Sequence, residues 1–588
     1  MRRRVVPIDH EADSEVDKAA NWCDGGSLRV NYRRQPTGRM TRVPLEGNVK
    51  RFPNNTPAAS SAGGAEICEA AGVLCLAAFL LFSQLGHYAL WDDEAETVLP
   101  ARAVWQTGDT NIVEGHNIVA PYQGLVERDL RERGNPPLSA YVLAPFAAFS
   151  GTGAFLPRLP FALCGLACVG LVLWWLKRDK ADRITWLLMV FAILGNVSFF
   201  LYFRQARYYG ITMLCSVAAA YIYLHWNGSW RGLLGLSLLL LAVLASHYMT
   251  FAALAGAMTV DYFFWQRRVR KLRLLDWFVL LGPVGLLGAI IVSIWNPFLL
   301  PGLLKQAGSN SLGDRLTLFW WNLRDLNRNE FCAGILILLA PVLYFVKGKN
   351  PFLLRGVVSI VVYCFVMAMV SPQPARGATV ADVRYLIPLI PLGMALEVTV
   401  VRILTRRAPV WLCVALGIVV FGTNLVNGGL FFPEGLRSTA WCFAKELISP
   451  PSDPYTETAN WINEHVNENA SIWVLPGYMA YPLIYHAPKA IYAWQLAWPP
   501  EPQFRGLPAV HFRGQIPPDY IICFGPVVRD VLGRMQHWAS LGIQYERAAT
   551  IDFFWKDMYR PELFWRSFTP IVDYNKDLEA IYVFKRAS

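Results

Sequence analysis

Three acidic side chains stand together where the first long apolar run of the sequence ends. The run covers residues 67–90, and the segment WDDEAE that follows it contains Asp92, Asp93 and Glu94. A carboxylate in such a place can take a proton from a substrate, or it can cap the helix that follows. Aspartate is favoured at the start of a helix, so a cap is the preferred interpretation of Asp92. The other two acids are candidates for chemistry.

Cationic and aromatic side chains gather in three later segments of the chain. They are Arg204, Arg207 and Tyr208 in RQARYYG, His247 in SHYMT, and Arg384 and Tyr385 in DVRYL. The planar guanidinium group of arginine is suited to holding two oxygens of an anion together. A charge beside an apolar run is also a common orienting signal for a membrane span, and this alternative is strongest for Arg204. For His247 the alternative is an interfacial side chain that anchors its turn.

The composition is typical of a membrane protein with many spans. Of the 588 residues, 54% are hydrophobic and only 16% are charged, and the mean hydropathy is +0.31. Soluble globular proteins carry roughly a quarter charged residues. The net charge of +11 does not indicate nucleic-acid binding, because the lysines and arginines lie mostly in short clusters between apolar runs. Such clusters are typical of loops that face the anionic cytoplasmic side of a membrane.

Eleven apolar runs are counted as spans, since a span needs about 20 mostly apolar residues. They lie at residues 67–90, 157–176, 184–203, 208–226, 231–249, 250–266, 274–298, 329–346, 353–371, 385–401 and 409–431. With the N-terminus inside, the strongest basic loops all fall on the cytoplasmic side. These loops are KRDKADR, QRRVRKLR, KGKNPFLLR and RILTRR. The sequence thus predicts a polytopic α-helical protein of the plasma (inner) membrane with a cytoplasmic N-terminus.

A further apolar stretch, at residues 136–149, is not counted as a span. It is short, and counting it would move KRDKADR to the outside. We predict a helix there that lies along the outer face or dips into it. The outer side then carries residues 91–156, RQARYYG, SHYMT, a loop at 299–328, SPQPARGATVADVR, and everything after about residue 432. The acids, the arginines and the membrane-edge histidine therefore collect on one side of the membrane.

The two ends of the chain differ from its apolar middle. Residues 1–66 are polar and lack a periodic apolar pattern, which predicts a disordered cytoplasmic tail. Residues 67–431 form the transmembrane part, whose first external loop is 91–156. Residues 432–588 show the pattern of an amphipathic helix and then of strands, including PDYIICFGP and LEAIYVFKRAS. We predict a small extracytoplasmic α/β domain that recognises a ligand or acts as a lid, because it contains neither a P-loop nor a dinucleotide fingerprint.

The order of five segments resembles that of a known superfamily. WDDEAE is followed by GNPPLSAYVL, RLPFALCGL, RQARYYGITML and DVRYLIPLIPL. This order and spacing resemble the GT-C superfamily of glycosyltransferases that use polyprenyl-phosphate sugars. Within it, the chain is most similar to the protein mannosyltransferases and to the lipid A aminoarabinose transferases. The resemblance covers residues 67–405 and implies a GT-C-like membrane domain.

The resemblance implies that a sugar moves from a lipid phosphate to an acceptor at the outer face. Asp93, with Glu94 beside it, matches the acidic pair of the first external loop and is implied to take the proton of the acceptor hydroxyl. The departing phosphate is a stable anion, which needs positive charge rather than a strong acid. Arg207 and Arg384 match the cations of the family, and Arg204 is a neighbour that can serve instead.

The remaining candidates concern the acceptor, the sugar and a metal. His247 matches a histidine that is common in the family at this turn, where it would contact the acceptor or a bound metal. Tyr208, Tyr385 and Asp92 are further candidates for the acceptor or sugar site. The aminoarabinose transferases carry a charged residue where this chain has Asn135, a departure that weakens the case for their metal site and sugar specificity. A divalent metal stays an open expectation, and no other cofactor is indicated.

Two other functions compete with this interpretation. A transporter or flippase of lipid-linked sugars is the main alternative, although transporters tend to bury ionisable residues near the bilayer midplane and to show internal repeats. Oligosaccharyltransferases show a Trp-Trp-Asp signature in their soluble domain and an acidic motif in the second external loop, and this chain has neither. The expected partners are a polyprenyl-phosphate sugar, membrane lipids and an acceptor hydroxyl on a protein, lipid A, a glycolipid or a polysaccharide.

Overall fold

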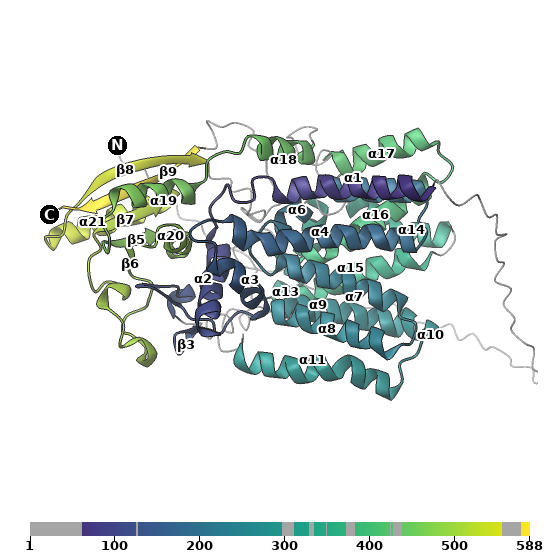
Figure 1. The fold of residues 1–588 in the computed structure, drawn as a ribbon, viewed down its shortest axis with the longest axis horizontal. Coiled ribbons are helices and arrows are strands. Elements are labelled where there is room, and N and C mark those ends of the chain that lie inside the picture. The colour runs from purple at the N-terminus through teal and green to yellow at the C-terminus, as the bar shows by residue number, and fades with distance from the viewer. Residues whose placement is uncertain are drawn as a thin grey trace, which may run out of the picture. The chain divides into compact units, whose positions relative to one another are not determined.

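A computed structural model describes most of the chain after its N-terminal segment. The described residues are 62–124, 127–296, 311–328, 334–347, 350–371, 383–423, 425–426, 438–554 and 578–587. The predicted cytoplasmic tail lies outside them up to residue 61, as do most of SPQPARGATVADVR and residues 432–437 of the predicted C-terminal domain. The described part is mainly helical and carries a five-stranded sheet near the C-terminus (Figure 1).

Helices occupy all of the apolar runs that the sequence marks as spans. They are α1 (Ala62–Phe82), α4 (Phe155–Arg178), α5 (Arg183–Gly195) with α6 (Val197–Phe203), α7 (Tyr209–His225), α8 (Trp230–Ser246), α9 (Tyr248–Asp261), α11 (Leu274–Ile294), α14 (Gly334–Val346), α15 (Pro351–Val370), α16 (Ile390–Leu404) and α17 (Val410–Gly422). By length and composition, four described helices can cross a membrane, or five if α5 and α6, bent by 60°, count as one span. The total of eleven spans stays a prediction.

Close helix packing depends on small residues at the contacts. α9 packs against α15, and α8 packs against α7 and α11 (Figure 1). Gly165 of α4 lies so near Phe203 of α6 that a Cβ atom there would come within 2.7 Å of the phenylalanine ring. A glycine therefore lets α4 approach α6 at this point, as small residues commonly do between membrane helices.

The turn that carries RQARYYG is positioned by the bend between α5 and α6. Asn196 ends α5, and its side chain caps α6 by accepting a hydrogen bond of 2.9 Å from the backbone N–H of Phe199. All residues of α6 are buried, and the helix ends at Arg204. The chain then turns into α7, so that the segment between α6 and α7 lies against the first external loop.

The predicted first external loop, residues 91–156, is built on two helices that pack against each other. These are α2 (Asp92–Thr107) and α3 (Leu138–Ala148), and between them run two hairpins, β1 (Val113–Glu114) with β2 (Asn117–Ile118) and β3 (Glu127–Arg128) with β4 (Arg131–Glu132). α3 confirms the helix predicted at residues 136–149, while its position relative to the membrane stays a prediction. A further amphipathic helix, α13 (Leu312–Arg328), occupies part of the predicted loop at 299–328, and the short α10 (Arg267–Val269) precedes α11.

The C-terminal part contains a mixed sheet, as the sequence predicts for this region. Its strands are β5 (Ser471–Leu475), β6 (Ile491–Tyr492), β7 (Tyr520–Phe524), β8 (Tyr545–Phe554) and β9 (Leu578–Arg586), in the order β6-β5-β7-β9-β8. β5 runs parallel to β6 and β7, and β9 runs antiparallel to β7 and β8. The helices of this part are α18 (Thr439–Ile448), α19 (Pro454–His465), α20 (Ala480–His486) and α21 (Val528–Ser540). The strands predicted from PDYIICFGP and LEAIYVFKRAS are confirmed as β7 and β9.

Hydrogen bonds fasten this C-terminal part to the first external loop. The Asn117 side chain in β2 donates to the carbonyl of Ala490 at 2.9 Å and accepts from the backbone N–H of Tyr492 at 2.8 Å. Near the start of α2, His486 accepts a hydrogen bond of 2.8 Å from the backbone N–H of Leu90. The loop that carries WDDEAE is therefore held between the helical part and the C-terminal sheet.

Candidate active site

Asp93 lies at the centre of a three-residue ion cluster. Its Oδ2 atom is 2.5 Å from Nη1 of Arg384 and 3.4 Å from Nη2 of Arg207. Asp93 belongs to the first turn of α2, Arg207 to the turn before α7, and Arg384 to the short 3₁₀ turn η4 (Val383–Tyr385). The structure thus brings together the predicted base and both predicted cations. Two guanidinium groups face one carboxylate, which leaves an excess of positive charge for an anionic ligand.

Arg207 is oriented by the first turn of α2. Its Nη1 donates to the backbone carbonyl of Asp93 and to the hydroxyl of Thr97, each at 2.8 Å. The Thr97 hydroxyl donates to the same carbonyl at 3.0 Å. The guanidinium of Arg207 therefore has a fixed direction beside the Asp93 carboxylate.

Glu94 points away from this cluster into a fully buried ion pair. Its carboxylate accepts hydrogen bonds of 2.9 and 2.5 Å from Nε and Nη2 of Arg158, and both side chains are 0% exposed. It also accepts one of 2.7 Å from the backbone N–H of Ala206, in the turn that carries Arg207. Glu94 thus joins α2, the start of α4 and this turn. Arg158 was missed by the sequence analysis, although an arginine inside a predicted span is a signal that could have found it.

Arg204 is buried at the end of α1, away from Asp93. Its Nη1 donates to the backbone carbonyls of Leu80 and Leu81, both at 2.9 Å, and the residue is 0% exposed. Carbonyls in the last turn of a helix lack partners within that helix, and arginine is one of the side chains that satisfy them. Through these hydrogen bonds, Arg204 at the end of α6 links that helix to the end of α1.

Asp92 occupies the first position of α2, after Trp91 at the capping position. The predicted cap therefore lies one residue earlier than expected. The backbone N–H of Trp91 donates to the Glu94 carboxylate at 3.3 Å. Asp92 is 5% exposed, and its negative charge lies at the positive end of the helix dipole.

Three aromatic rings stack next to the arginines. Tyr208 lies on His247 with ring centroids 4.2 Å apart and planes 8° apart, and Tyr385 also stacks on His247, at 5.4 Å and 19°. The Nδ1 atom of His247 accepts a hydrogen bond of 3.2 Å from the backbone N–H of Thr250 and so caps α9. The hydroxyl of Tyr363 in α15 donates to the carbonyl of Tyr385 at 2.9 Å. The stack ties together the two segments that carry Arg207 and Arg384.

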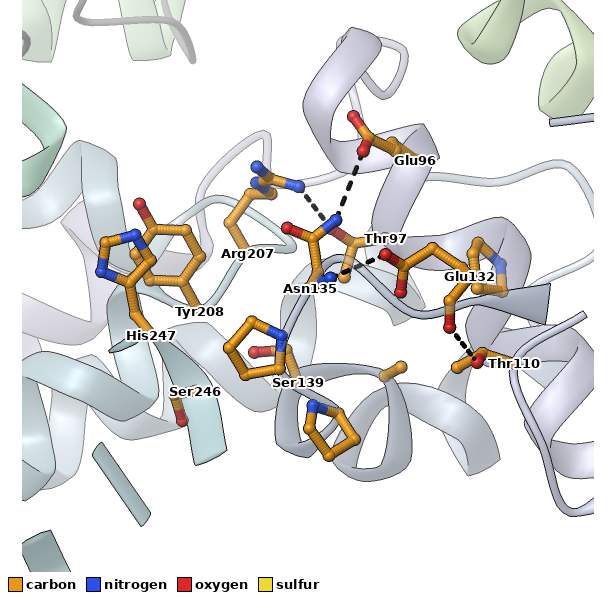
Figure 2. A pocket seen from close by; sticks show the side chains of 14 residues that line it. Glu96, Thr97, Thr110, Glu132, Asn135, Ser139, Arg207, Tyr208, Ser246 and His247 are labelled. Atoms are coloured by element: carbon orange, nitrogen blue, oxygen red, sulfur yellow. Dashed lines mark hydrogen bonds between the residues drawn. The ribbon is translucent and has the colours of Figure 1, made fainter. Parts of the chain in front are cut away.

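A pocket with about 490 Å³ of empty space opens beside Arg207 (Figure 2). It lies between α2, the segment before α3, and the turns before α7 and α9. The polar side chains that line it include those of Glu96, Thr97, Glu132, Asn135, Arg207 and His247. Arg207 lines this pocket and also pairs with Asp93, so it connects the two.

Two glutamates that the sequence analysis missed line this pocket, and Asn135 bridges them. The Asn135 side chain donates to Glu96 at 3.4 Å, and its backbone N–H donates to Glu132 at 2.7 Å (Figure 2). Burial raises the pKa of Glu96 to about 8, with Arg207 opposing this shift and Asp93 adding to it. Burial likewise raises the pKa of Glu132 to about 7, against the hydrogen bonds from Asn135 and Gly134. Glu96 follows Asp93 by three positions on one helix, a spacing that could have revealed it.

The described residues contain no cluster of three or more histidine, cysteine, aspartate or glutamate side chains with the spacing of a metal site. Glu132, Glu96 and His247 do line one pocket, and they are the donors from which a metal ligand set would have to be drawn. Among the described residues, the structure therefore shows no complete ligand set for the divalent metal that the sequence analysis left open.

Comparisons with known proteins identify solved structures with a similar fold. No family model matches the sequence, and no curated protein matches it. The crystal structure of ArnT from Cupriavidus metallidurans in the apo state matches with a TM-score of 0.50 and 13% identity, over 81% of this chain and 95% of that one. The chain has an ArnT-like fold. This agrees with the resemblance to the GT-C superfamily and to the lipid A aminoarabinose transferases that the motif order carries.

A second ArnT structure from the same organism, bound to undecaprenyl phosphate, matches with a TM-score of 0.48 and 13% identity. The match covers 90% of this chain and 98% of the ArnT chain. At such low identity the likeness to ArnT describes the fold, and the chemistry has to be argued from the side chains.

Proposed function

We propose that this chain is an integral-membrane, inverting glycosyltransferase that moves a sugar from a polyprenyl-phosphate carrier to an acceptor hydroxyl at the outer face of the membrane. The observation that carries the proposal is the Asp93 cluster, in which two arginines from distant segments share one carboxylate next to a pocket. The ArnT-like fold supports it.

The cluster suggests how donor binding prepares the base. Before the donor arrives, the Asp93 carboxylate is paired with Arg207 and Arg384 and is not free to accept a proton. A phosphate competes for the same guanidinium groups, since it can accept two parallel hydrogen bonds from each. Donor binding therefore draws the arginines from Asp93 to the phosphate and frees the carboxylate as a base.

The reaction then balances in a single displacement. The acceptor oxygen forms a bond to the anomeric carbon, and its proton passes to Asp93. The bond between the anomeric carbon and the phosphate oxygen breaks, and its electron pair stays on the polyprenyl phosphate. Arg207 and Arg384 stabilise that charge. One displacement at one carbon inverts its configuration.

The other candidate residues receive supporting roles in this proposal. Glu94, through Arg158 and the N–H of Ala206, holds Asp93 and the Arg207 turn in register, so it acts by positioning rather than by touching substrate. Tyr208, Tyr385 and Asp92 stay proposed parts of the sugar or acceptor surroundings. We further propose the predicted topology, with the N-terminus cytoplasmic and the C-terminal domain outside the membrane.

The glycosyltransferase and the transporter alternative make opposite predictions about the lipid carrier. The purified chain, in vesicles that contain a labelled polyprenyl-phosphate sugar and a candidate acceptor, should release free polyprenyl phosphate as sugar is transferred. A transporter should move the intact lipid across the vesicle wall and release none. The same assay with acceptors of different classes, from peptides to lipid A and polysaccharide fragments, would identify the acceptor. Intact lipid carriers after incubation with every acceptor class would contradict the proposal.

A further inference from the structure

The Nδ1 nitrogen of His247 is engaged by Thr250. Nδ1 accepts a hydrogen bond from the backbone N–H of Thr250 at 3.2 Å, and it lies 2.8 Å from the hydroxyl oxygen of the same residue. Because Nδ1 acts as the acceptor that caps α9, we assign the proton of the neutral imidazole to Nε2. The hydrogen bond to Thr250 therefore assigns Nε2 as a hydrogen-bond donor.

The ring is held in one orientation. The stacks with Tyr208 and Tyr385 restrict rotation of the ring, and these tyrosines directly follow the two arginines in the sequence. His247 also lines the pocket beside Arg207 (Figure 2). A neutral donor and two guanidinium groups are thus gathered on adjoining segments.

We propose that the Nε2–H group of His247 donates a hydrogen bond to a phosphate oxygen of the lipid-linked donor. The inference rests on the proposed function, which supplies the phosphate. His247 would bind and orient the phosphate without gaining or losing a proton during the reaction. A neutral donor suits this place, because it can hydrogen-bond to the phosphate without repelling the two neighbouring arginines. Tyr208 and Tyr385 then act as positioning residues for the imidazole.

The competing explanation is that His247 only caps α9, and two substitutions separate the roles. His247→Asn keeps a side-chain acceptor that can cap the helix, since asparagine is a favoured cap, but it removes the donor at Nε2. His247→Gln carries an amide N–H on a longer side chain that reaches toward the position of Nε2, while glutamine is a poor cap. Binding should therefore follow the donor, and thermal stability should follow the cap.

The measurement is the affinity of the full-length chain in nanodiscs for undecaprenyl phosphate, with the unfolding temperature recorded for each variant. His247→Asn should weaken binding about 10- to 100-fold, as expected for the loss of a hydrogen bond to a charged group, and should keep its unfolding temperature. His247→Gln should bind more tightly than His247→Asn and unfold at a lower temperature.

His225 offers a matched control. It also stacks on a tyrosine, Tyr221, at 4.4 Å and 23°, and its Nε2 lies 2.9 Å from Asp179. This histidine lies at the opposite end of α7 from Arg207. His225→Asn should leave undecaprenyl phosphate binding unchanged, so an equal loss of binding in both asparagine variants would count against a specific role of His247.

Three results would overturn the proposal. If His247→Asn binds undecaprenyl phosphate within twofold of the unaltered chain, His247 is a helix cap only. If a chelator lowers the affinity of the unaltered chain to that of His247→Asn, the nitrogen serves as a metal ligand and not as a donor to phosphate. If the unaltered chain does not bind undecaprenyl phosphate, the proposed function fails, and the assignment of a phosphate oxygen fails with it.

Discussion

The two ends of α7 each meet an aspartate–arginine cluster, and the two clusters are built differently. Before the first residue of α7, Asp93 shares a single oxygen between two arginines. In the last turn of α7, the Tyr223 hydroxyl donates to Asp261 at 2.7 Å. Arg355 of α15 donates to both carboxylate oxygens of the same aspartate, at 2.7 and 2.6 Å. The Asp261 side chain is 7% exposed and that of Asp93 is 20% exposed. The second cluster is closed, whereas the first lies next to a pocket.

The difference shows how one pair of residue types serves two purposes. A guanidinium group has five N–H donors, and a carboxylate can accept a fork of two. At Asp261 one arginine meets one carboxylate in a matched fork of two bonds, and the pair joins α9 to α15. At Asp93 two guanidinium groups meet one carboxylate, so the cluster has a net positive charge that suits an anionic ligand. We infer that the Asp261 cluster holds helices together and that the Asp93 cluster binds and reacts.

The strongest way to break this comparison is to replace Asp93. Asp93→Asn should lower kcat by about 10²- to 10⁴-fold, the range of a positioned general base. The change keeps the shape of the side chain and removes a competitor for the arginines, so undecaprenyl phosphate should bind at least as tightly as before. Turnover of a labelled lipid-linked sugar and the unfolding temperature are the measurements. Turnover within tenfold of the unaltered chain would show that Asp93 is not the base.

Replacing the neighbouring residue, Glu94, should lower activity for a different reason, namely a loss of folded protein. Glu94→Gln leaves the buried charge of Arg158 without its partner, which typically costs about 3–5 kcal/mol. We expect a loss of folded protein in denaturation experiments, with activity falling in proportion to it. A double variant that replaces Glu94 with leucine and Arg158 with methionine should recover much of the stability, because both buried charges are removed. Normal stability of Glu94→Gln with abolished turnover would instead favour a catalytic role.

Replacing Asp261 should give the reverse of the Asp93 result. Asp261→Asn weakens the bonds to Arg355 and Tyr223, at a cost of about 1–3 kcal/mol for charged hydrogen bonds. The unfolding temperature should fall, while kcat per folded molecule stays unchanged. A large drop in kcat without a change in stability would mean that the closed cluster takes part in the reaction.

The smallest expected effect is a pH dependence that comes from the pocket. Because the pKa of Glu96 is raised to about 8, its side chain is mainly neutral below that pH and becomes negative above it. A new negative charge beside Arg207 repels a phosphate, so undecaprenyl phosphate affinity should decline as the pH rises through 8. The Glu96→Gln variant cannot ionise at this position, so its affinity should decline less over this interval, with the part due to Glu132 (pKa about 7) remaining. The same decline in both proteins would assign the pH dependence to another group.

Local patterns predicted much of the fold. The apolar runs specify helices because a buried or lipid-facing segment must satisfy its own backbone hydrogen bonds, and each run contains a helix in the structure. The alternating apolar residues of PDYIICFGP and LEAIYVFKRAS specify strands for a similar local reason. The ArnT-like fold was anticipated by the order of five short motifs, although the identity to ArnT is only 13%.

Local sequence patterns predicted only part of the candidate site. Asp93, Arg207 and Arg384 were selected as a group from their side of the membrane and from the family resemblance, and the structure brings their side chains into contact. Glu96 and Glu132 were missed, because their importance depends on burial in a pocket rather than on any local motif.

By itself, the sequence determined where most helices and strands form, because these properties depend on neighbours within a few turns of chain. It also predicted that the charged segments share a side of the membrane. Only the tertiary structure decided what each charge does. Asp93 and Glu94 are adjacent and alike in chemistry, yet one faces two arginines beside a pocket and the other is sealed against Arg158. Their partners come from different helices, so the direction of each side chain is set by packing between distant segments.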